Sequence, residues 1–426
     1  MLSSIEKNRL IRLNQQLFSV VRDIRILRHL SWPAQAKLTF FANKARELPQ
    51  VEYPQYDASS TLKKLQDVKS QLQSTVYDDW LAKQVATAEN TALLLASCGS
   101  ENFYRYSTQL FGTPKDTLLD GSSTALSLAE KFNDLLSGFS SLPDSTSEPD
   151  RSADYAAQVI ATGAQDLFGD QAPQLSVVDE LSANALAGAK RIRLRRSASF
   201  SDRDIQQLIQ HEAYIHVATA LNGRQQNSLP VLGCSHAGTT RTQEGLAVFA
   251  EFITGTLDLD RMRRLSDRMI AIQMSVEGAD FLQVYQYFLE QTQGNEDQSY
   301  ENSRRVFRGG VLTGGAPFTK DIVYLDGLVR VHNFLRSAVA ANRADCIQLL
   351  FCGKLDLDDI PVLGQLHTEG LCNSPRYLPP WVSDMQFLLC YLAYSSFLNG
   401  IDLQKVKTHY EALLNATPVI HDSVDR

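Results

Sequence analysis

The chain has 426 residues, of which 44% are hydrophobic, 21% charged and 9% aromatic. This composition excludes wholesale disorder and fibrous architectures, and the length predicts two or three packed subdomains. Lys and Arg number 41 against 48 Asp and Glu, which gives a net charge of −7. That balance argues against a nucleic-acid binder with a broad cationic face.

The six cysteines include no CxxC pair and are too few for a disulfide framework in a chain of this size. The N-terminal residues carry charge where a secretory signal needs an apolar stretch. No window approaches the roughly 20 apolar residues of a membrane span. These features predict a cytoplasmic protein that does not enter a membrane.

Amphipathic helices are predicted over residues 5–135, because apolar side chains recur at three- and four-residue steps, as in Leu10, Leu13, Leu17 and Val21. The Ser-, Pro- and Asp-rich residues 137–154 have little to bury and predict a linker.

After a helix expected at Ala156–Phe168, the segments Gln174–Val178 and Lys190–Arg195 have strand character. In the second segment Ile192 and Leu194 alternate with arginines, which predicts one buried face and one basic face.

Two helices are expected to follow. Ser201 is a good N-cap, and its helix should run to Asn222. A second helix is predicted from Thr242 to Thr254. From about residue 260 to 422 the periodicity is again helical, except for the glycine-rich segment Phe307–Lys320, which must be a loop. The apolar run Phe387–Leu398 predicts a buried helix.

The segment Gln210–Val217 places His211, His216 and Glu212 within one expected helix. Hydrolytic zinc sites commonly take two histidines and one glutamate, and the metal lowers the pKa of a bound water molecule to about 7. A carboxylate beside the site can accept the proton as that water attacks a carbonyl. Glu212 is the predicted base.

The spacing of the two histidines constrains the helix. Five residues at about 100° each leave the rings roughly 140° apart on a regular α-helix, so one ion could not bind both. A π-type bulge would widen the turn, and such bulges gather at functional sites. We therefore predict a departure from α-helical bonding at Ala213–His216.

A third ligand should come from another element. Glu244 is the best candidate because it opens the second expected helix, and Gly245 after it would let the two helices approach closely. Cys234 and His236 are chemically possible ligands in a connection rich in Gly, Ser and Thr. From composition and pattern alone, a structural histidine pair explains the string as well as metal binding does.

Three motifs in order, His211–His216, Thr242–Ala247 and Gly315–Gly327, resemble the QEGLA-motif family described as flavohaemoglobin expression-modulating proteins. The microtubule-associated tyrosine carboxypeptidases look like its eukaryotic members. The resemblance runs through about residues 150–340.

The resemblance implies a zincin-like peptidase with one Zn²⁺ per chain, bound by His211, His216 and Glu244, with Glu212 as the catalytic base. It implies removal of a C-terminal residue from a peptide or protein. The chain shows no recognisable microtubule-binding extension, so tubulin is a doubtful substrate.

A carboxypeptidase needs a cation for the terminal carboxylate, and Arg308, Lys320 and Arg241 are the candidates. Solvated surface charge is the plain alternative for each. Tyr324 could hold the oxyanion as a second catalytic residue, or it could simply begin a buried helix. The basic strand Lys190–Arg196 could pair with an extended acidic peptide, or it could be a solvated face.

The sequence thus predicts a mainly α protein with a small β-sheet. Its regions are N-terminal helices over 1–136, a linker over 137–154, a zinc peptidase domain over 155–340 and C-terminal helices over 341–426 packed on that domain. The leading function is a zinc metallocarboxypeptidase with no nucleic-acid or membrane partner. The alternative is a non-catalytic regulatory protein with a structural metal site that modulates flavohaemoglobin expression.

Overall fold

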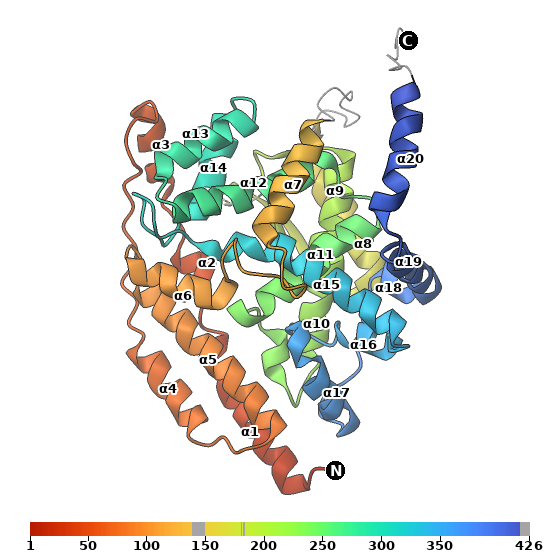
Figure 1. Cartoon of the computed structure of the whole chain (residues 1–426). Helices are drawn as coiled ribbons and strands as arrows, with labels where there is room; N and C mark the ends of the chain where they lie inside the picture. The colour runs from red at the N-terminus through yellow and green to blue at the C-terminus, as the bar shows by residue number, and fades with distance from the viewer. Residues whose placement is uncertain (139–149, 180, 182–183, 418–426) are drawn as a thin grey trace.

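The computed structural model describes residues 1–138, 150–179, 181 and 184–417 (Figure 1). The chain is 65% helical with a small sheet, so the predicted mainly α fold is confirmed. Among the described residues no helix combines the length and the apolar character needed to cross a membrane. The zincin-like core stays a prediction.

The N-terminal region is a succession of helices, as predicted. Leu13 and Leu17 of the first helix are completely buried, and Ser3 caps it by accepting a hydrogen bond from the Glu6 N–H. The helices are α1 (Ser4–Val21), α2 (Ile26–His29), α3 (Ala34–Ala42), α4 (Ser59–Lys69), α5 (Val76–Ala96), α6 (Glu101–Phe111) and α7 (Ala125–Ser137).

Most of the predicted linker over 137–154 lies outside the described residues. Its last part is ordered structure: β1 (Arg151–Ser152) leads directly into α8 (Ala153–Phe168). The Ser152 hydroxyl caps this helix by accepting from the Tyr155 N–H. The helix therefore begins three residues before the expected Ala156.

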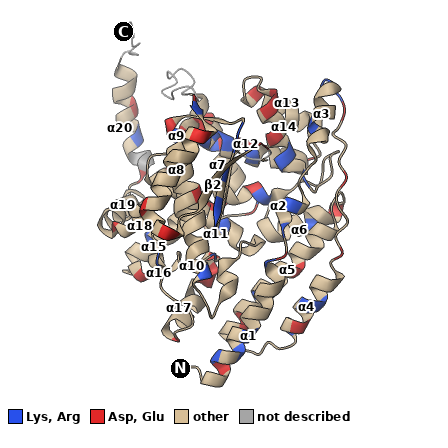
Figure 2. Ribbon diagram, turned by 180° about the vertical axis from the view of Figure 1, so that it is seen from behind, with Lys and Arg blue, Asp and Glu red and all other residues tan. Residues whose placement is uncertain are grey.

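Three strands form a sheet in the order β2 (Gln174–Val178), β4 (Arg191–Arg195) and β3 (Ala185–Gly188), and β1 pairs separately with β5 (Ser199–Phe200). β4 runs parallel to β2 and antiparallel to β3. The predicted burial pattern of β4 is confirmed, because Ile192 and Leu194 are completely buried and the arginines lie on the other face. Figure 2 shows basic residues in blue on the strands beside β2.

The strand order corrects one expectation. Of the two alternatives for the basic strand within Lys190–Arg196, direct pairing with a peptide is wrong, because β4 is bonded on both sides and has no free backbone edge. Within this sheet β3 is an edge strand, and the N–H of its Ala187 donates to the Glu212 side chain instead of to another strand.

The two site helices follow the sheet. Ser201 and Asp204 form a capping box before α9 (Asp202–Leu208), and the helix continues through the π-helix η2 (Ile209–Val217) into α10 (Ala218–Arg224). A short 3₁₀ turn, η3 (Pro230–Gly233), connects it to α11 (Ala237–Ile253).

The start of α11 differs from the expected Thr242. The helix begins five residues earlier, because His236 occupies the N-cap position and exchanges capping hydrogen bonds with Thr239. Ala237 and Thr239 are buried, so packing overrides the weak helix propensity of this Gly- and Thr-rich turn. Glu244 consequently lies inside the helix rather than at its opening.

α11 crosses α15 (Val323–Ala340) in the middle of the molecule (Figure 1). A Cβ atom added at Gly245 would lie 2.3 Å from the Gly327 carbonyl oxygen. Gly245 therefore allows a close helix contact, but its partner is α15, not the histidine-bearing helix as expected.

The remaining elements complete a mostly helical second half. The glycine-rich loop is confirmed for residues 308–318. The elements are η1 (Gly169–Gln171), α12 (Leu259–Val276), α13 (Phe281–Gln291), α14 (Glu296–Phe307), η4 (Thr319–Ile322), α16 (Ala344–Leu349), η5 (Leu357–Asp359), α17 (Ile360–Thr368), α18 (Pro380–Ser383), α19 (Met385–Leu398) and α20 (Leu403–Ala416).

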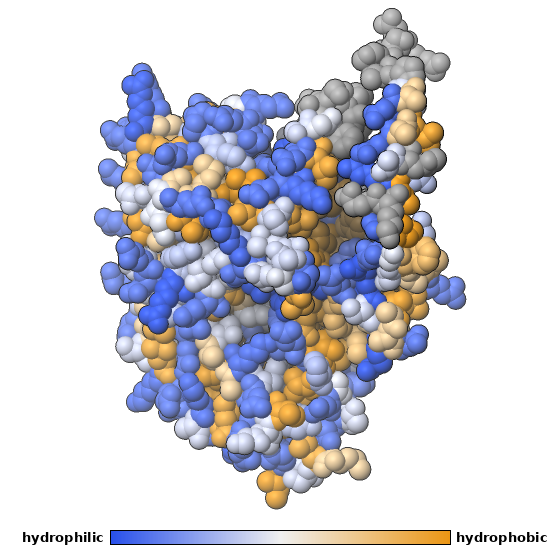
Figure 3. All heavy atoms as spheres, viewed as in Figure 1, coloured by the Kyte–Doolittle hydropathy of each residue, from blue (hydrophilic) through white to orange (hydrophobic). Residues whose placement is uncertain are grey.

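The apolar run Phe387–Leu398 does form a helix, α19, but the prediction that it is buried is wrong. Leu388 and Leu392 are completely buried, whereas Phe387 is 49% and Phe397 67% exposed. Apolar residues appear in orange along the α19 and α20 side of the molecule in Figure 3. An apolar run alone cannot distinguish a core helix from one that packs through a single stripe.

Three hydrophobic clusters make up the core. The first joins N-terminal helices to α11, α15 and the C-terminal helices; the second joins α5 and α6 to α12–α14; the third joins the sheet, α8 and the π-helix. Each cluster combines residues from more than one of the predicted regions. The division at 137–154 and at 340 stays a prediction.

The Gly245–Gly327 contact yields a stability prediction. Gly245→Ala should destabilise the protein by about 2 kcal/mol or more, because the added methyl group has no space against the α15 backbone. Urea unfolding measures the change. Gly364→Ala in α17 is the matched control: its added Cβ would meet only Leu349 at 3.9 Å, so it should be neutral or slightly stabilising. Equal behaviour of the two variants would contradict the close helix contact.

Candidate functional site

The π-helix brings the two histidines to one side of their helix, as the five-residue spacing predicted. In this geometry backbone bonds run from i to i+5, so His216 lies one turn above His211. The ring centroids are 4.9 Å apart with the planes at 84°. The predicted departure from α-helical bonding is confirmed, and it extends over Ile209–Val217 rather than four residues.

Glu244 reaches both rings from α11. Its Oε2 atom lies 3.4 Å from Nε2 of His211 and 3.5 Å from Nε2 of His216. Donor atoms of these three residues all lie within 4.8 Å of one another. Within the described part of the chain no other such group of His, Cys, Asp and Glu occurs, so Cys234 and His236 are not part of it.

These donors suit a divalent transition metal. A tetrahedral ion with ligand bonds of about 2.1 Å separates neighbouring ligand atoms by about 3.4 Å, close to the 3.4 and 3.5 Å separations at Glu244 Oε2. Glu244 Oε2, the atom that faces Nε2 of both rings, is buried without a hydrogen-bond partner, and a buried unpaired polar atom is costly. Two imidazoles and a carboxylate match the donor types of hydrolytic zinc sites.

Glu251 holds His211 from behind. Its Oε1 atom lies 2.6 Å from Nδ1 of His211, and its side chain is completely buried. Arg261 donates to both carboxylate oxygens at 2.9 and 3.0 Å, and Gln207 donates at 2.8 Å. The carboxylate directs Nε2 of His211 toward Glu244 and fixes the ring orientation.

The charges of this group shift several pKa values. Burial alone would raise the pKa of Glu244, but Lys320 and the two histidines outweigh it and hold that pKa well below its usual range. Burial likewise opposes ionisation of Glu251, yet Arg261 and His211 lower its pKa to about 2. Both carboxylates are therefore anions at neutral pH.

Glu212 faces the sheet. Its Oε2 atom accepts a hydrogen bond from the backbone N–H of Ala187 in β3 at 3.1 Å. The side chain is half-buried, beside His211 in sequence and against the edge strand. This position leaves a carboxylate at the boundary between the three-residue group and the open strand edge.

A buried cation cluster lies on the α15 side of Glu244. It comprises Arg261, Arg268, Arg305, Arg308 and Lys320. Lys320 lies 3.3 Å from Glu244 Oε1, and Arg305 binds Asp321 at 2.6 Å. The carboxylates in contact with the cluster are Glu244, Glu251 and Asp321. Five cations thus meet three anions, and the surroundings carry an excess of positive charge.

Burial and the excess positive charge lower the pKa values of two guanidinium groups. Burial, together with the neighbouring Arg305, lowers the pKa of Arg268 to about 9 and that of Arg308 to about 10. Arg308 has no carboxylate partner among the described residues. Nε of both arginines is buried without a hydrogen-bond partner, and Nε of Arg268 lies 3.9 Å from Asp321. Such a group is costly to bury without an anion.

Three of the side chains predicted to bind substrate or hold the oxyanion lie in the cation cluster, and the fourth lies outside it. Arg308, Lys320 and Tyr324 belong to the cluster: Tyr324 accepts from Arg305 at 3.4 Å, and Lys320 lies over its ring. Arg241 lies apart, because its guanidinium binds Asp326 at 2.8 Å and donates to the Phe111 carbonyl. The roles assigned to these four side chains stay predictions.

Sequence reasoning missed three charged residues. Glu251 lies two helical turns after Glu244 within an otherwise apolar stretch of α11, a signal that could have been noticed. Arg268 sits in a helix rich in charge, where nothing marks it. Lys354 lies in a loop after α16, and only the fold brings it close enough to Glu244 and Glu212 to feel their charges. Burial lowers the pKa of Lys354 to about 8, although these two carboxylates oppose that shift.

A sequence model of the microtubule-associated tyrosine carboxypeptidase family matches residues 38–400. A search of curated proteins finds no match. The family match shows the class of protein, which is a carboxypeptidase-type hydrolase. The chain belongs to the microtubule-associated tyrosine carboxypeptidase family, and the match extends well beyond the motif region of residues 150–340.

The support of His211 by Glu251 is testable. Glu251→Gln should weaken the predicted zinc binding by about ten- to a hundredfold, because the glutamine cannot supply the negative charge that orients and polarises the imidazole. Competition with a chromophoric chelator measures the affinity. Glu130→Gln, at an exposed position of α7, is the control. Unchanged affinity in a folded Glu251→Gln variant would contradict the assigned role.

Proposed function

We propose that the protein is a zinc-dependent carboxypeptidase that removes the C-terminal residue of a peptide or protein. Family membership supports the reaction class. The convergence of His211, His216 and Glu244 next to a buried cation cluster with unmatched positive charge is the observation that carries the finer proposal.

His211, His216 and Glu244 would hold the zinc ion, which supplies a Lewis acid that polarises a carbonyl group and makes water more acidic. The remaining work belongs to side chains of the chain. Glu251 orients His211, and Lys320 neutralises the second oxygen of Glu244. The π-helix keeps both rings in place before substrate arrives.

Glu212 acts as the general base. Its carboxylate is held by one backbone hydrogen bond from Ala187 and retains a second oxygen for a proton. A proton taken from the attacking water can pass from Glu212 to the nitrogen of the departing residue, which leaves with a neutral amine. The edge strand thereby positions the base relative to the peptide.

The cation cluster receives the terminal carboxylate of the substrate. The Nε atoms of Arg268 and Arg308, which make no hydrogen bond to the described residues, offer charge-assisted donors. A substrate carboxylate would offset part of the excess positive charge, which raises affinity for chains that end there. An internal peptide segment lacks this anion, so the cluster favours cleavage at a C-terminus. Tyr324 lies among these groups and can donate to the scissile carbonyl oxygen.

The base is tested by Glu212→Gln. This variant should bind zinc with unchanged stoichiometry and lose at least about a hundredfold in kcat, because the amide cannot accept the proton. Single-residue losses from a peptide library, read by mass spectrometry, measure cleavage. Full activity of the variant, or the absence of trimming by the zinc-loaded parent protein, would favour a non-catalytic regulatory role.

The cation cluster is tested by Arg308→Met. The variant should lose about ten- to a hundredfold in kcat/KM for a peptide with a free C-terminus, the value of one or two charge-assisted hydrogen bonds. The C-terminally amidated peptide should be affected little. Thermal stability should be unchanged or higher, since an unpaired buried cation is removed.

Arg241→Met is the comparison for this experiment. Asp326 already engages its guanidinium, so the discrimination between free and amidated peptides should persist in that variant. If Arg241→Met removes the discrimination and Arg308→Met does not, the carboxylate does not bind at the cluster.

A further inference from the structure

The helix α19 carries a row of exposed apolar side chains. Phe387, Cys390, Tyr394 and Phe397 follow one another at steps of three, four and three residues, and Ile401 continues the row just past the end of the helix. All five are exposed. Residues at these steps lie on one side of a helix, so the row is a single apolar stripe turned toward solvent.

The opposite side of α19 holds the helix to the body. Leu388 and Leu392 are completely buried and belong to the core cluster that contains Val331 of α15. The helix contains no charged residue. A helix that is apolar all round is normally buried on every side. Because the body covers only one side of α19, the exposed row is a candidate contact surface.

The helix α20 extends this surface. Figures 1 and 2 show it reaching away from the other helices. Every residue from Tyr410 to Thr417 is exposed, and Leu414 is 70% exposed. Val406, Tyr410 and Leu413 are again four and three residues apart. A helix of 14 residues is only marginally stable in water by itself. The family match ends at residue 400, so α20 lies beyond it.

We call the exposed apolar side of the two helices the α19–α20 face. Together its seven large apolar side chains expose about 700 Å², more than the patch of about 300–600 Å² that is usual on a monomer. A standard protein interface takes about 800 Å² from each partner. The face is therefore large enough for a stable contact. The seven residues are Phe387, Tyr394, Phe397, Leu398, Ile401, Leu413 and Leu414.

The spacing of the apolar row indicates what kind of partner it fits. Alternating steps of three and four residues form the seam through which helices pack against one another, knobs into holes. Every copy of the chain carries the same seam, and two identical surfaces can cover each other about a twofold axis. Each chain has a net charge of −7, so two copies approach most easily where charge is lacking, as on α19.

A lipid surface fits the face less well. Helices that lie on membranes combine an apolar side with lysines and arginines on the polar side, which bind anionic headgroups. α19 contains no lysine or arginine. In α20, Lys407 pairs with Glu411 at 3.3 Å, so part of its positive charge is already neutralised. The charges therefore favour a second copy of the chain over a membrane.

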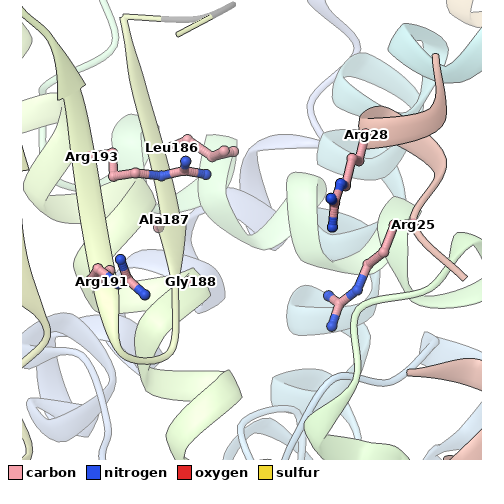
Figure 4. A pocket seen from close by; sticks show the side chains of 7 residues that line it. All are labelled: Arg25, Arg28, Leu186, Ala187, Gly188, Arg191 and Arg193. Atoms are coloured by element: carbon pink, nitrogen blue, oxygen red, sulfur yellow. The ribbon is translucent and has the colours of Figure 1, made fainter. Parts of the chain in front are cut away.

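The candidate site lies away from this face. Beside β3, a cavity of about 590 Å³ is lined by Arg25 and Arg28 and, across from them, by Arg191 and Arg193 (Figure 4). Like charges on two copies would repel each other there. Figures 1 and 2 place α2, which carries Arg28, and α19 on different sides of the molecule. A contact through α19 and α20 thus leaves the site open.

We propose that two copies of the chain associate through the α19–α20 face, each covering the apolar row of the other about a twofold axis. The interface would bury about 1,400 Å² of apolar surface in total, within the range of standard interfaces. The inference is independent of the proposed carboxypeptidase function, because no residue of the candidate site takes part in the contact.

Sedimentation velocity of the full chain tests the association. At about 100 µM the parent protein should have a mass near twice the 47.5 kDa of one chain. Phe397→Glu and Leu413→Glu should each weaken the dimer at least about a hundredfold, because each places an unpaired charge in the contact.

Leu119→Glu is the matched control. It makes the same change at a position that is 89% exposed and lies outside the face, so the dimer should persist. Phe397, Leu413 and Leu119 all face water in one chain, so the three variants should fold alike. Circular dichroism and thermal unfolding at low protein concentration check this.

The thiol of Cys390 gives a second readout. It is exposed in one chain and lies within the apolar row, so the dimer should cover it. In the parent dimer Cys390 should react with iodoacetamide at least about fivefold more slowly than in Leu413→Glu, whose changed residue lies in the other helix. Cys346 in α16 lies outside the face and should react equally in both proteins. Mass spectrometry of the peptides measures both rates.

The proposal is overturned if the parent protein stays monomeric at about 100 µM, or if its dimer survives either substitution in the face. A dimer in which Cys390 reacts as fast as in Leu413→Glu uses another surface and also overturns it. Sedimentation of a monomeric parent protein with vesicles of phosphatidylcholine and phosphatidylserine would assign the face to a lipid surface instead.

Discussion

The arrangement of the site depends on one local constraint, the i to i+5 bonding of Ile209–Val217. An α-helix would direct His211 and His216 to different sides, and no change of side-chain rotamer would bring both to one point. The π-helix is uncommon because its backbone geometry is less favourable than that of an α-helix. Here the capping box at Ser201, the packing of Ala213 and Val217 in the core, and the Glu251 contact to His211 stabilise it.

α11 supplies the other half of the site. Glu244 and Glu251 lie two turns apart on the same face, so a single helix provides one direct donor and the support for another. The contact between Gly245 and Gly327 lets α11 pack closely against α15. This packing brings the segment with Lys320 and Tyr324 next to α11, where Lys320 pairs with Glu244. Positive charge then accumulates on the α15 side of the site, where Lys320 lies 3.3 Å from Glu244.

Local patterns in the sequence were sufficient to predict the mainly helical fold, the buried and basic faces of β4, and the distortion of the helix that carries His211 and His216. Each of these features follows from residue spacing along one element. The true start of α11 was missed, since the Ala-Gly-Thr-Thr turn is helical only when packed and capped by His236. The partner of Gly245, the edge position of β3 and the approach of Arg268 and Lys354 depend on long-range contacts. Such contacts leave no periodic signal, so those features required the fold.

The central claim is that two imidazole nitrogens and one carboxylate bind a single zinc ion. X-ray absorption spectroscopy at the zinc edge of protein loaded with one equivalent of metal tests it most directly. We expect a first shell of nitrogen and oxygen only, at about 2.0–2.1 Å, with the multiple scattering of two imidazoles. A spectrum with sulfur at about 2.3 Å, or without imidazole scattering, would contradict the account.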